Sequence, residues 1–275
     1  MDGSAKVMVL GDDGSVGADA AWEWVTLQRW PGWSVQVLAA RIPRALAPRP
    51  DLAVPHPWTP PTPRVADPRT EIADVVHLTA ADDPRLALHG CSDADLLVIG
   101  PRGVGRLAAL VLGSTAEWLM HHPPAPLVIV RAPKEVRRVL VCLDGSIHAE
   151  RALDALLTMP WISGCSVTLL AHGDATLPDP LPVTAAAADR VAPHAAAVEQ
   201  RPVPIDPTSL FFNVRAAILD TIEELQPELV VMGTRGLGPL KRLQLGSTAS
   251  AITRLAPCSV LLVRAADTED DTAAG

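Results

Sequence analysis

Short, mainly apolar runs alternate along the chain with longer segments in which apolar positions recur with helical spacing. The apolar runs cover residues 7–10, 35–39, 96–99 and 127–130 in the first half of the chain and 139–143, 167–171, 229–232 and 260–263 in the second. Runs without regular polar alternation are typical of strands covered on both faces. Because strands that alternate with helices favour right-handed crossovers, the pattern predicts an α/β fold with a mostly parallel sheet.

The same order of predicted elements occurs twice along the chain. Each half begins with an apolar run that leads into Asp-Gly-Ser, at residues 13–15 and 144–146, and ends with an apolar run followed by Arg-Ala. Between them, the pattern Gly-x-x-Gly, nine residues, Gly-Ser-Thr occurs at residues 100–115 and again at 233–248. Agreement at three separated places predicts a tandem duplication, with one domain at residues 1–134 and a second at 135–265.

The middles of the two halves differ. Residues 43–68 hold nine prolines and are expected to form a long surface excursion beside the first site. Residues 183–198 are expected to form a helix interrupted near Pro193. The tail at 266–275 lacks the apolar residues that would anchor it and is predicted to be disordered.

The glycine pattern predicts an anion site in each half. Gly100 and Gly233 directly follow an apolar run, and ligands of open α/β sheets bind beyond the carboxyl ends of the strands. A glycine there removes the Cβ that would keep a ligand away from the main chain. Gly113 and Gly246 precede helical patterns, so free amide groups and a positive dipole end would face a phosphate. The alternative interpretation is turn glycines followed by a serine N-cap.

Together with the Asp-Gly-Ser turn, this motif resembles that of the universal stress protein family, over about residues 5–265. The resemblance implies two Rossmann-like domains related to adenine nucleotide α-hydrolases, each with a five-stranded, mostly parallel sheet in the order 3-2-1-4-5 and helices on both faces. It also implies that the ligand is ATP, or AMP or ADP, with Mg²⁺ on the phosphates. By the same resemblance, the first site comprises Asp13, Ala39, Gly100, Arg102, Gly103, Gly113, Ser114 and Thr115, and the second comprises Asp144, Ala171, Gly233, Arg235, Gly236, Gly246, Ser247 and Thr248.

The resemblance gives these residues separate roles. Asp13 and Asp144 would face the nucleoside, and the main chain near Ala39 and Ala171 would contact the adenine edge. The glycine loops and their hydroxyl groups would hold ribose and phosphates.

One pair of positions distinguishes the two sites. Arg102 and Arg235 occupy the same place and would add charge-assisted bonds to phosphate. Before them, Pro101 stands where the second half has Thr234, and proline cannot donate a backbone N–H. We therefore expect weaker binding at the first site and consider the second the better candidate.

Charge and cysteine content exclude other classes of protein. The formal net charge of −8 and pI of about 5.4 argue against a nucleic-acid or anionic-membrane surface. The four scattered cysteines indicate neither a zinc site nor a disulfide framework, and favour a reducing compartment. Since the sequence shows no signal peptide and no apolar segment of membrane-spanning length, we expect a soluble cytoplasmic protein.

The remaining chemical groups predict no catalytic or metal site. Asp144, Ser146 and His148 are close in sequence, but a catalytic triad needs a spatial relay with an oxyanion hole. Since no general base is evident beside the glycine loops, we expect little or no ATP hydrolysis. The cluster of Trp22, Trp24, Trp30 and Trp33 is compatible with a core, a subunit contact or both.

The last apolar run of each half is predicted to be a sheet edge, which invites pairing. In a tandem chain the two edges can pair with each other as an intrachain pseudo-dimer, with a homodimer of whole chains as a separate question. The favoured function is a nucleotide-dependent regulator in the stress response. The alternatives are a nucleotide-independent protein–protein interaction module of the same fold and an enzyme that forms or cleaves an adenylate.

Overall fold

The computed structural model describes residues 5–42, 60–102, 112–173, 177, 179–204, 213–236 and 245–265. Three predictions therefore fall outside the described residues: residues 43–59 of the proline-rich excursion, Gly103 of the first glycine loop, and the tail at 266–275.

Ten strands of the described chain form one continuous sheet, in the order β3-β2-β1-β4-β5-β10-β9-β6-β7-β8. The first half contributes β1 (Lys6–Gly11), β2 (Trp33–Ala40), β3 (Asp74–Ala80), β4 (Leu96–Ile99) and β5 (Leu127–Ile129), and the second contributes β6 (Arg138–Leu143), β7 (Ser166–His172), β8 (Ala197–Val203), β9 (Leu229–Gly233) and β10 (Ser259–Val263). Within each half the pairing is parallel and the order is 3-2-1-4-5, which confirms the predicted fold.

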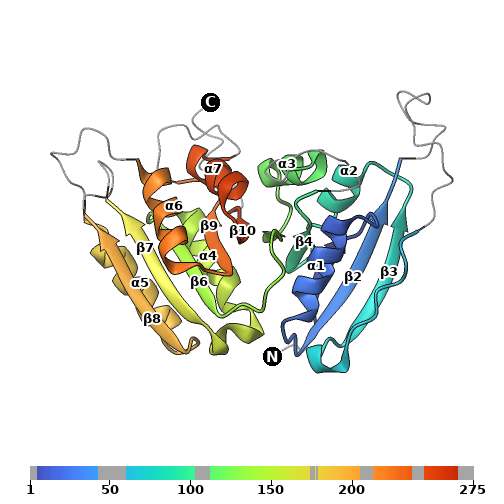
Figure 1. The fold of residues 1–275 in the computed structure, drawn as a ribbon, viewed down its shortest axis with the longest axis horizontal. Coiled ribbons are helices and arrows are strands. Elements are labelled where there is room, and N and C mark those ends of the chain that lie inside the picture. The colour runs from blue at the N-terminus through green and yellow to red at the C-terminus, as the bar shows by residue number, and fades with distance from the viewer. Residues whose placement is uncertain are drawn as a thin grey trace.

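The two halves join in the middle of the sheet. Strands β5 and β10 pair antiparallel, with Val128 opposite Leu261 at the centre of the register. The last strands of the two halves thus cover each other, as expected for an intrachain pseudo-dimer. Figure 1 shows the halves side by side, with the helices that follow the two glycine loops near each other.

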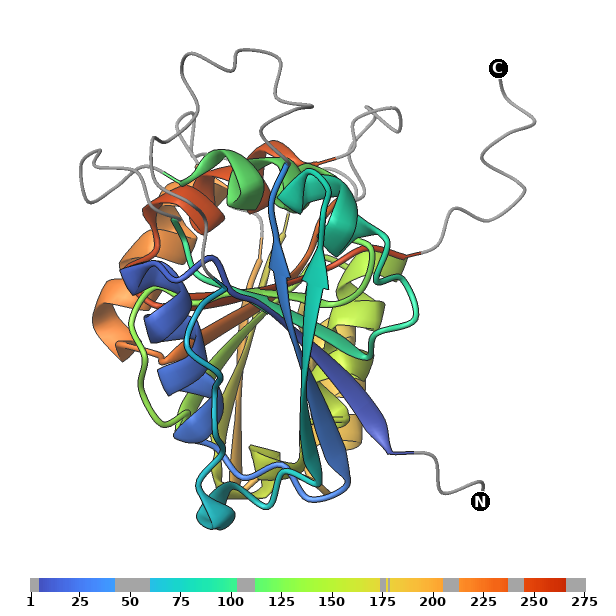
Figure 2. The same cartoon turned by 90° about the vertical axis from the view of Figure 1, so that its right-hand side faces the viewer.

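Helices cover both faces of this sheet (Figure 2). The described helices are α1 (Val16–Thr26), α2 (Pro84–His89), α3 (Ser114–His121), α4 (Ile147–Leu157), α5 (Leu181–Val191), α6 (Val214–Leu225) and α7 (Ser247–Leu255), with short 3₁₀ turns η3 (Pro68–Thr70) and η4 (Pro160–Gly164). Buried side chains of α1, α4 and α5 belong to one core, and those of α2, α3, α6 and α7 belong to a second core on the opposite face. None of the helices in the described ranges is long and apolar enough to cross a membrane.

Four tryptophans connect the halves through the first of these cores. Trp161 of η4 lies edge-on to Trp24, with ring centroids 6.3 Å apart, and to Trp30 at 6.1 Å. Trp33 in turn lies 5.3 Å from Trp30. Since Trp24, Trp30 and Trp33 are each at most 2% exposed, the cluster is core. It is also the place where the second half packs on the first.

Gln28 adds a polar connection beside the tryptophans. Its side-chain amide donates to the carbonyl of Lys134 at 2.9 Å, and its side-chain oxygen accepts from Val136 N at 3.0 Å. The segment between the halves is thereby held against the end of α1.

The prediction for the middle of the second half is partly wrong. Helix α5 ends at Val191, and β8 begins at Ala197, so the predicted helix over 183–198 runs too far. Residues after α5 turn back because the N–H groups of His194 and Ala195 bond to the carbonyl of Val191.

Candidate functional site

The Asp-Gly-Ser turn has the same geometry in both halves. Gly14 and Gly145 have φ angles of 73° and 75°, a left-handed conformation that favours glycine. The aspartate before each glycine accepts a hydrogen bond from the backbone N–H two residues on: Asp13 Oδ1 from Ser15 at 3.1 Å, and Asp144 Oδ1 from Ser146 at 3.0 Å. The turn and its carboxylate are thus fixed locally.

The serine of each turn connects it to the glycine loop. Ser15 caps α1 by accepting from Ala18 N, and its hydroxyl donates to the carbonyl of Arg102 at 3.2 Å. Ser146 makes the equivalent contacts with Ala149 N and the carbonyl of Arg235, each at 3.2 Å. Two segments far apart in sequence are therefore held together at the carboxyl ends of the strands.

Close packing gives a reason for a glycine at the end of β4 and β9 that the sequence analysis did not include. A Cβ on Gly100 would lie 2.2 Å from the carbonyl oxygen of Gly17, and one on Gly233 would lie 2.6 Å from the carbonyl carbon of His148. Both neighbours are backbone atoms in the first turns of α1 and α4. These glycines allow a helix to approach the strand end closely, and Gly100 also lines the cavity described below.

Helices α3 and α7 begin without a capping side chain. Gly113 and Gly246 are the N-cap residues, with extended backbone, and neither end has a side-chain cap bond. Ser114 and Ser247 are the first residues inside the helices, so the alternative interpretation as serine N-caps is wrong. The first-turn amides thus meet no capping oxygen, which makes both helix starts suited to an anion.

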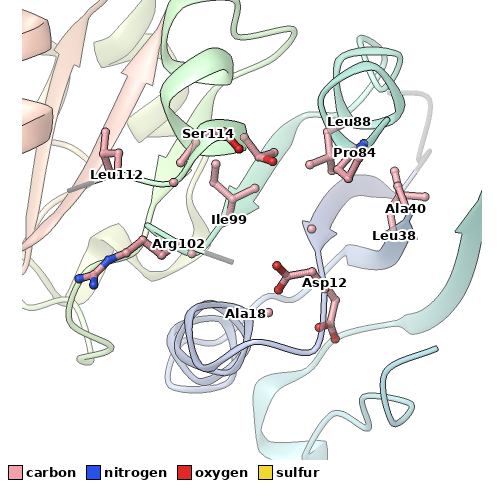
Figure 3. A pocket seen from close by; sticks show the side chains of 16 residues that line it. Asp12, Ala18, Leu38, Ala40, Pro84, Leu88, Ile99, Arg102, Leu112 and Ser114 are labelled. Atoms are coloured by element: carbon pink, nitrogen blue, oxygen red, sulfur yellow. The ribbon is translucent and has the colours of Figure 1, made fainter. Parts of the chain in front are cut away.

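A cavity of about 420 Å³ lies beside the start of α3 (Figure 3). Six residues of the predicted first site line it: Asp13, Gly100, Arg102, Gly113, Ser114 and Thr115. Ala39 is buried and does not line it, but its neighbours Leu38 and Ala40 do. The volume is in the usual range for small-molecule sites.

Several lining residues were missed from the sequence. Leu38, Ala40, Pro84, Leu88 and Ile99 form an apolar wall from the ends of β2 and β4 and from α2. Figure 3 shows Leu88 and Pro84 on the side of the cavity away from Arg102. Helix α2 has only six residues, and its apolar pattern is too short to have identified it as part of a site.

Asp12 is a further lining residue that the sequence analysis overlooked. Its side chain is 1% exposed, and its Oδ1 accepts from Gly14 N at 2.9 Å. The equivalent position in the second half is Leu143. A comparison of the two copies therefore could not identify Asp12. The two adjacent aspartates before Gly14, which occur in the first half alone, could have indicated it.

Arg102 lines the cavity, but its guanidinium lies on the far side from Asp12 in Figure 3. Burial, and after it the nearby charge of Arg102, lowers the pKa of Arg131, which donates to the carbonyls of Thr253 and Arg254 at the end of α7. In this conformation the side chain of Arg102 is turned toward the junction of the halves.

The structure gives no reason for Pro101 to weaken binding at the first site in the way that the sequence analysis predicted. The N–H of Thr234, at the equivalent place, donates to the carbonyl of Val263 at 2.9 Å and is thus part of the backbone pairing. The carbonyls of both residues accept from the N-cap glycines, Gly113 at 2.8 Å and Gly246 at 2.7 Å. Losing the N–H at Pro101 removes no donor that a ligand could have used.

In the second half, the predicted residues gather in the same arrangement. Gly236 lies so close to Asp144 that a Cβ on Gly236 would be 2.3 Å from Asp144 Oδ2. Ala171 is buried in β7, next to His172 at the position equivalent to Ala40. Ser247 and Thr248 form the first turn of α7, and the carbonyl of Arg235 accepts the hydrogen bond from Ser146.

Ser146 and His148 each make a hydrogen bond with the backbone. The hydroxyl of Ser146 donates to a carbonyl, and His148 Nδ1 accepts from Ala265 N at 2.8 Å, just after β10. This imidazole nitrogen fixes the end of the last strand.

The cysteines are protected thiols. Burial raises the pKa of Cys142 to about 12 and that of Cys258 to about 11. Both groups therefore remain protonated at neutral pH, which makes them weak nucleophiles and poor metal ligands.

The fold and site define a class of protein: paired Rossmann-like α/β units in which a glycine loop and an uncapped helix start meet at the carboxyl edge of the sheet. A family model described as the universal stress protein family matches residues 86–131 and 135–264. The chain belongs to the universal stress protein family.

Individual relatives agree with this assignment. The chain is similar to a universal stress protein of Mycolicibacterium smegmatis, with 26% identity over 66% of this chain and 65% of that protein, and therefore covers less than two thirds of its length. A universal stress protein of Thermus aquaticus is 33% identical over 46% of this chain and 98% of its own. Among solved structures, a universal stress protein from Archaeoglobus fulgidus has a TM-score of 0.64 and 20% identity, covering 94% of this chain and 98% of that chain, which shows the shared fold.

Proposed function

We propose that this protein binds an adenine nucleotide, ATP, ADP or AMP, at the cavity of its first half and at the equivalent place in the second. It would act as a nucleotide-dependent regulator in the stress response, with Mg²⁺ carried on the phosphates. The observation that carries the proposal is the start of α3, which has no side-chain cap and borders the cavity.

The lining of the cavity has an apolar part and a polar part, which suit the base and the ribose phosphate of a nucleotide. The apolar wall that includes Leu38, Pro84 and Leu88 suits a flat base. Asp13, fixed by the Asp-Gly-Ser turn, can accept hydrogen bonds from ribose hydroxyls. The amides at Ser114 and Thr115, with the positive end of the helix dipole, suit the phosphates.

The second half supports a further site by its matching geometry. Gly246 starts α7 without a side-chain cap, as Gly113 starts α3, and the Asp144 turn is bonded like the Asp13 turn. Since the penalty assigned to Pro101 has no basis in the structure, we expect the first site to bind at least as well as the second.

The test is to fill each helix start with a carboxylate. Gly113 has φ −70° and ψ 160°, and Gly246 has φ −68° and ψ 149°, values that aspartate adopts readily. Aspartate is a favoured N-cap, so Gly113→Asp and Gly246→Asp should keep the fold while occupying the first-turn amides and repelling phosphate. In calorimetric titration with Mg·ATP, each variant is expected to lose one binding site, and the double variant both.

Thermal unfolding of each variant controls for folding. We expect melting temperatures close to that of the wild-type protein, because the gain of a cap is offset at Gly246 by a Cβ that would lie 3.3 Å from Thr234 O. Failure of the wild-type protein to bind ATP, ADP or AMP at millimolar concentration would refute the proposal and favour the nucleotide-independent module. Unchanged ATP binding in the folded double variant would show that the ligand lies elsewhere. We expect negligible phosphate release from ATP by the wild-type protein.

A further inference from the structure

The described end of the proline-rich segment, residues 60–67, packs against the Asp-Gly-Ser turn of the first half. Pro61 lies over Gly14, where its Cγ would be 3.7 Å from a Cβ on that glycine. The backbone N–H of Arg64 donates to His77 Nε2 of β3 at 2.8 Å. These contacts hold the segment between the edge strand and the turn.

Arg64 then reaches the buried carboxylate beside the cavity. Its Nε donates to Asp12 Oδ2 at 2.7 Å and its Nη2 to Asp12 Oδ1 at 3.2 Å, and Nη2 also lies 2.8 Å from Asp19 Oδ1. The hydrogen bond with Asp12 is the main cause of the raised pKa of Arg64. Because Asp12 is almost fully buried, its charge needs such a partner.

The second half contains only part of this arrangement. Glu150 of α4 stands at the position of Asp19 and pairs with Arg190 of α5, which also pairs with Asp154. An arginine between the second and third strands thus binds the first helix in both halves. The second half cannot repeat the contact between Arg64 and Asp12, because Leu143 stands at the position of Asp12.

We propose that Arg64 sets the charge of the first site: by neutralising Asp12, it allows a cavity lined by two adjacent carboxylates to accept a polyanionic nucleotide. The inference depends on the proposed function, and makes Arg64 a positioning residue that acts through Asp12. Without Arg64, Asp12 would add an uncompensated negative charge to the cavity wall. Repulsion would then grow with ligand charge and would be stronger for ATP than for adenosine.

The test compares ATP and adenosine in a Gly246→Asp background, in which the new carboxylate keeps ATP from the second site. Adenosine has no phosphate to repel, but the second half is identical in both proteins compared, so any change in adenosine binding comes from the first site. Arg64→Gln is expected to weaken ATP binding by about tenfold or more, the order of magnitude for one added unit charge acting on a polyanion beside a protein surface. Adenosine binding should change much less, and the ATP loss should shrink at high salt. Adding Asp12→Asn to Arg64→Gln should restore ATP affinity, because the uncompensated charge is gone.

Arg190→Gln is the matched control, since it removes an arginine that binds the first helix of the other half and contacts no turn carboxylate. It should leave the ratio of ATP to adenosine affinity unchanged. Equal losses of ATP and adenosine in Arg64→Gln, or no rescue by Asp12→Asn, would overturn the inference while leaving the proposed function intact. If Arg64→Gln does not fold, the double variant with Asp12→Asn still decides: ATP binding much weaker than in the background protein overturns the inference.

Discussion

At the scale of single residues, glycines serve two physical purposes around the site. Gly14 and Gly145 adopt positive φ angles that close the Asp-Gly-Ser turn. Gly100 and Gly233 instead leave space for backbone atoms of a neighbouring helix. At the first two positions the backbone conformation disfavours other residues, and at the second two there is no space for a side chain. Substitutions at the two kinds of position should therefore destabilise the protein for different reasons.

Gly100→Ala should be strongly destabilising. Its Cβ would lie 2.2 Å from Gly17 O, and because a backbone oxygen cannot rotate away, α1 must shift from the strand. We expect a loss of about 3 kcal/mol or more in the free energy of unfolding, at or above the upper end for overpacked sites. Urea denaturation measures it.

Gly90→Ala is the matched control in the same half. Gly90 has φ −65°, and its Cβ would meet neighbours only at 3.5 Å, an ordinary contact. This variant should be neutral or slightly stabilised. A Gly100→Ala protein as stable as Gly90→Ala would contradict the close approach of α1 to β4.

The same residues show how much of the site the sequence could predict. Asp13, Gly113 and Ser114 were identified because the motif occurs twice, and repetition separates a pattern from chance. Asp12 escaped notice because Leu143 replaces it in the second copy, and Arg64 because the proline-rich segment that carries it has no match there. Features that distinguish the halves lie outside what a comparison between them can detect.

At the scale of elements, helices that start at the same edge of the sheet begin in two ways. Helices α1 and α4 are capped by Ser15 and Ser146, whereas α3 and α7 begin at glycine without a side-chain cap. At a capped start, one backbone N–H donates to the side chain of the capping residue. At an uncapped start, the first-turn N–H groups can donate to a ligand or to water. This division is why we propose that α3 and α7, rather than α1 and α4, are the helices that bind the ligand.

This difference predicts opposite effects of serine replacement. Ser15→Ala and Ser146→Ala should each cost about 1 kcal/mol of stability, because they remove a cap. Ser114→Ala, inside the first turn of α3, should cost nearly nothing in stability and act on nucleotide affinity instead. Chemical denaturation with and without ATP separates the two effects, and an equal stability loss in Ser15→Ala and Ser114→Ala would count against the assignment of the caps.

The elements also differ in how well they could be predicted. Strands β1, β4, β6 and β9 lie inside the sheet, and their apolar runs identified them. Strands β3 and β8 are the outer edges, and most of their side chains are exposed or only partly buried. With Glu199, Arg201 and Pro202 along β8, no apolar run marked it, so only the resemblance implied a third strand in each half.

At the scale of the whole molecule, the two halves share one sheet and the core on each of its faces. The β5–β10 pairing joins them on the sheet, and Arg254 of α7 pairs with Glu117 of α3 above it. On the opposite face, Trp161 packs against Trp24 and Trp30. Contacts on both faces should make the halves unfold together, because neither keeps its buried surface without the other.

Trp161→Ala tests this coupling. Trp161 is the one tryptophan of the second half among seven in the chain, so in the variant all tryptophan fluorescence comes from the first half. If the halves are one cooperative unit, fluorescence should report a loss of about 3 kcal/mol even though the change lies in the second half, a magnitude usual for truncating a large aromatic side chain. Circular dichroism should give the same urea midpoint.

Leu255→Ala is the control, because it truncates a side chain of the second half that is 53% exposed. It should leave both signals near wild type. A fluorescence transition that stays at the wild-type midpoint, or one separated from the dichroism transition, would show that the first half is stable on its own and that the tryptophan cluster does not join the two.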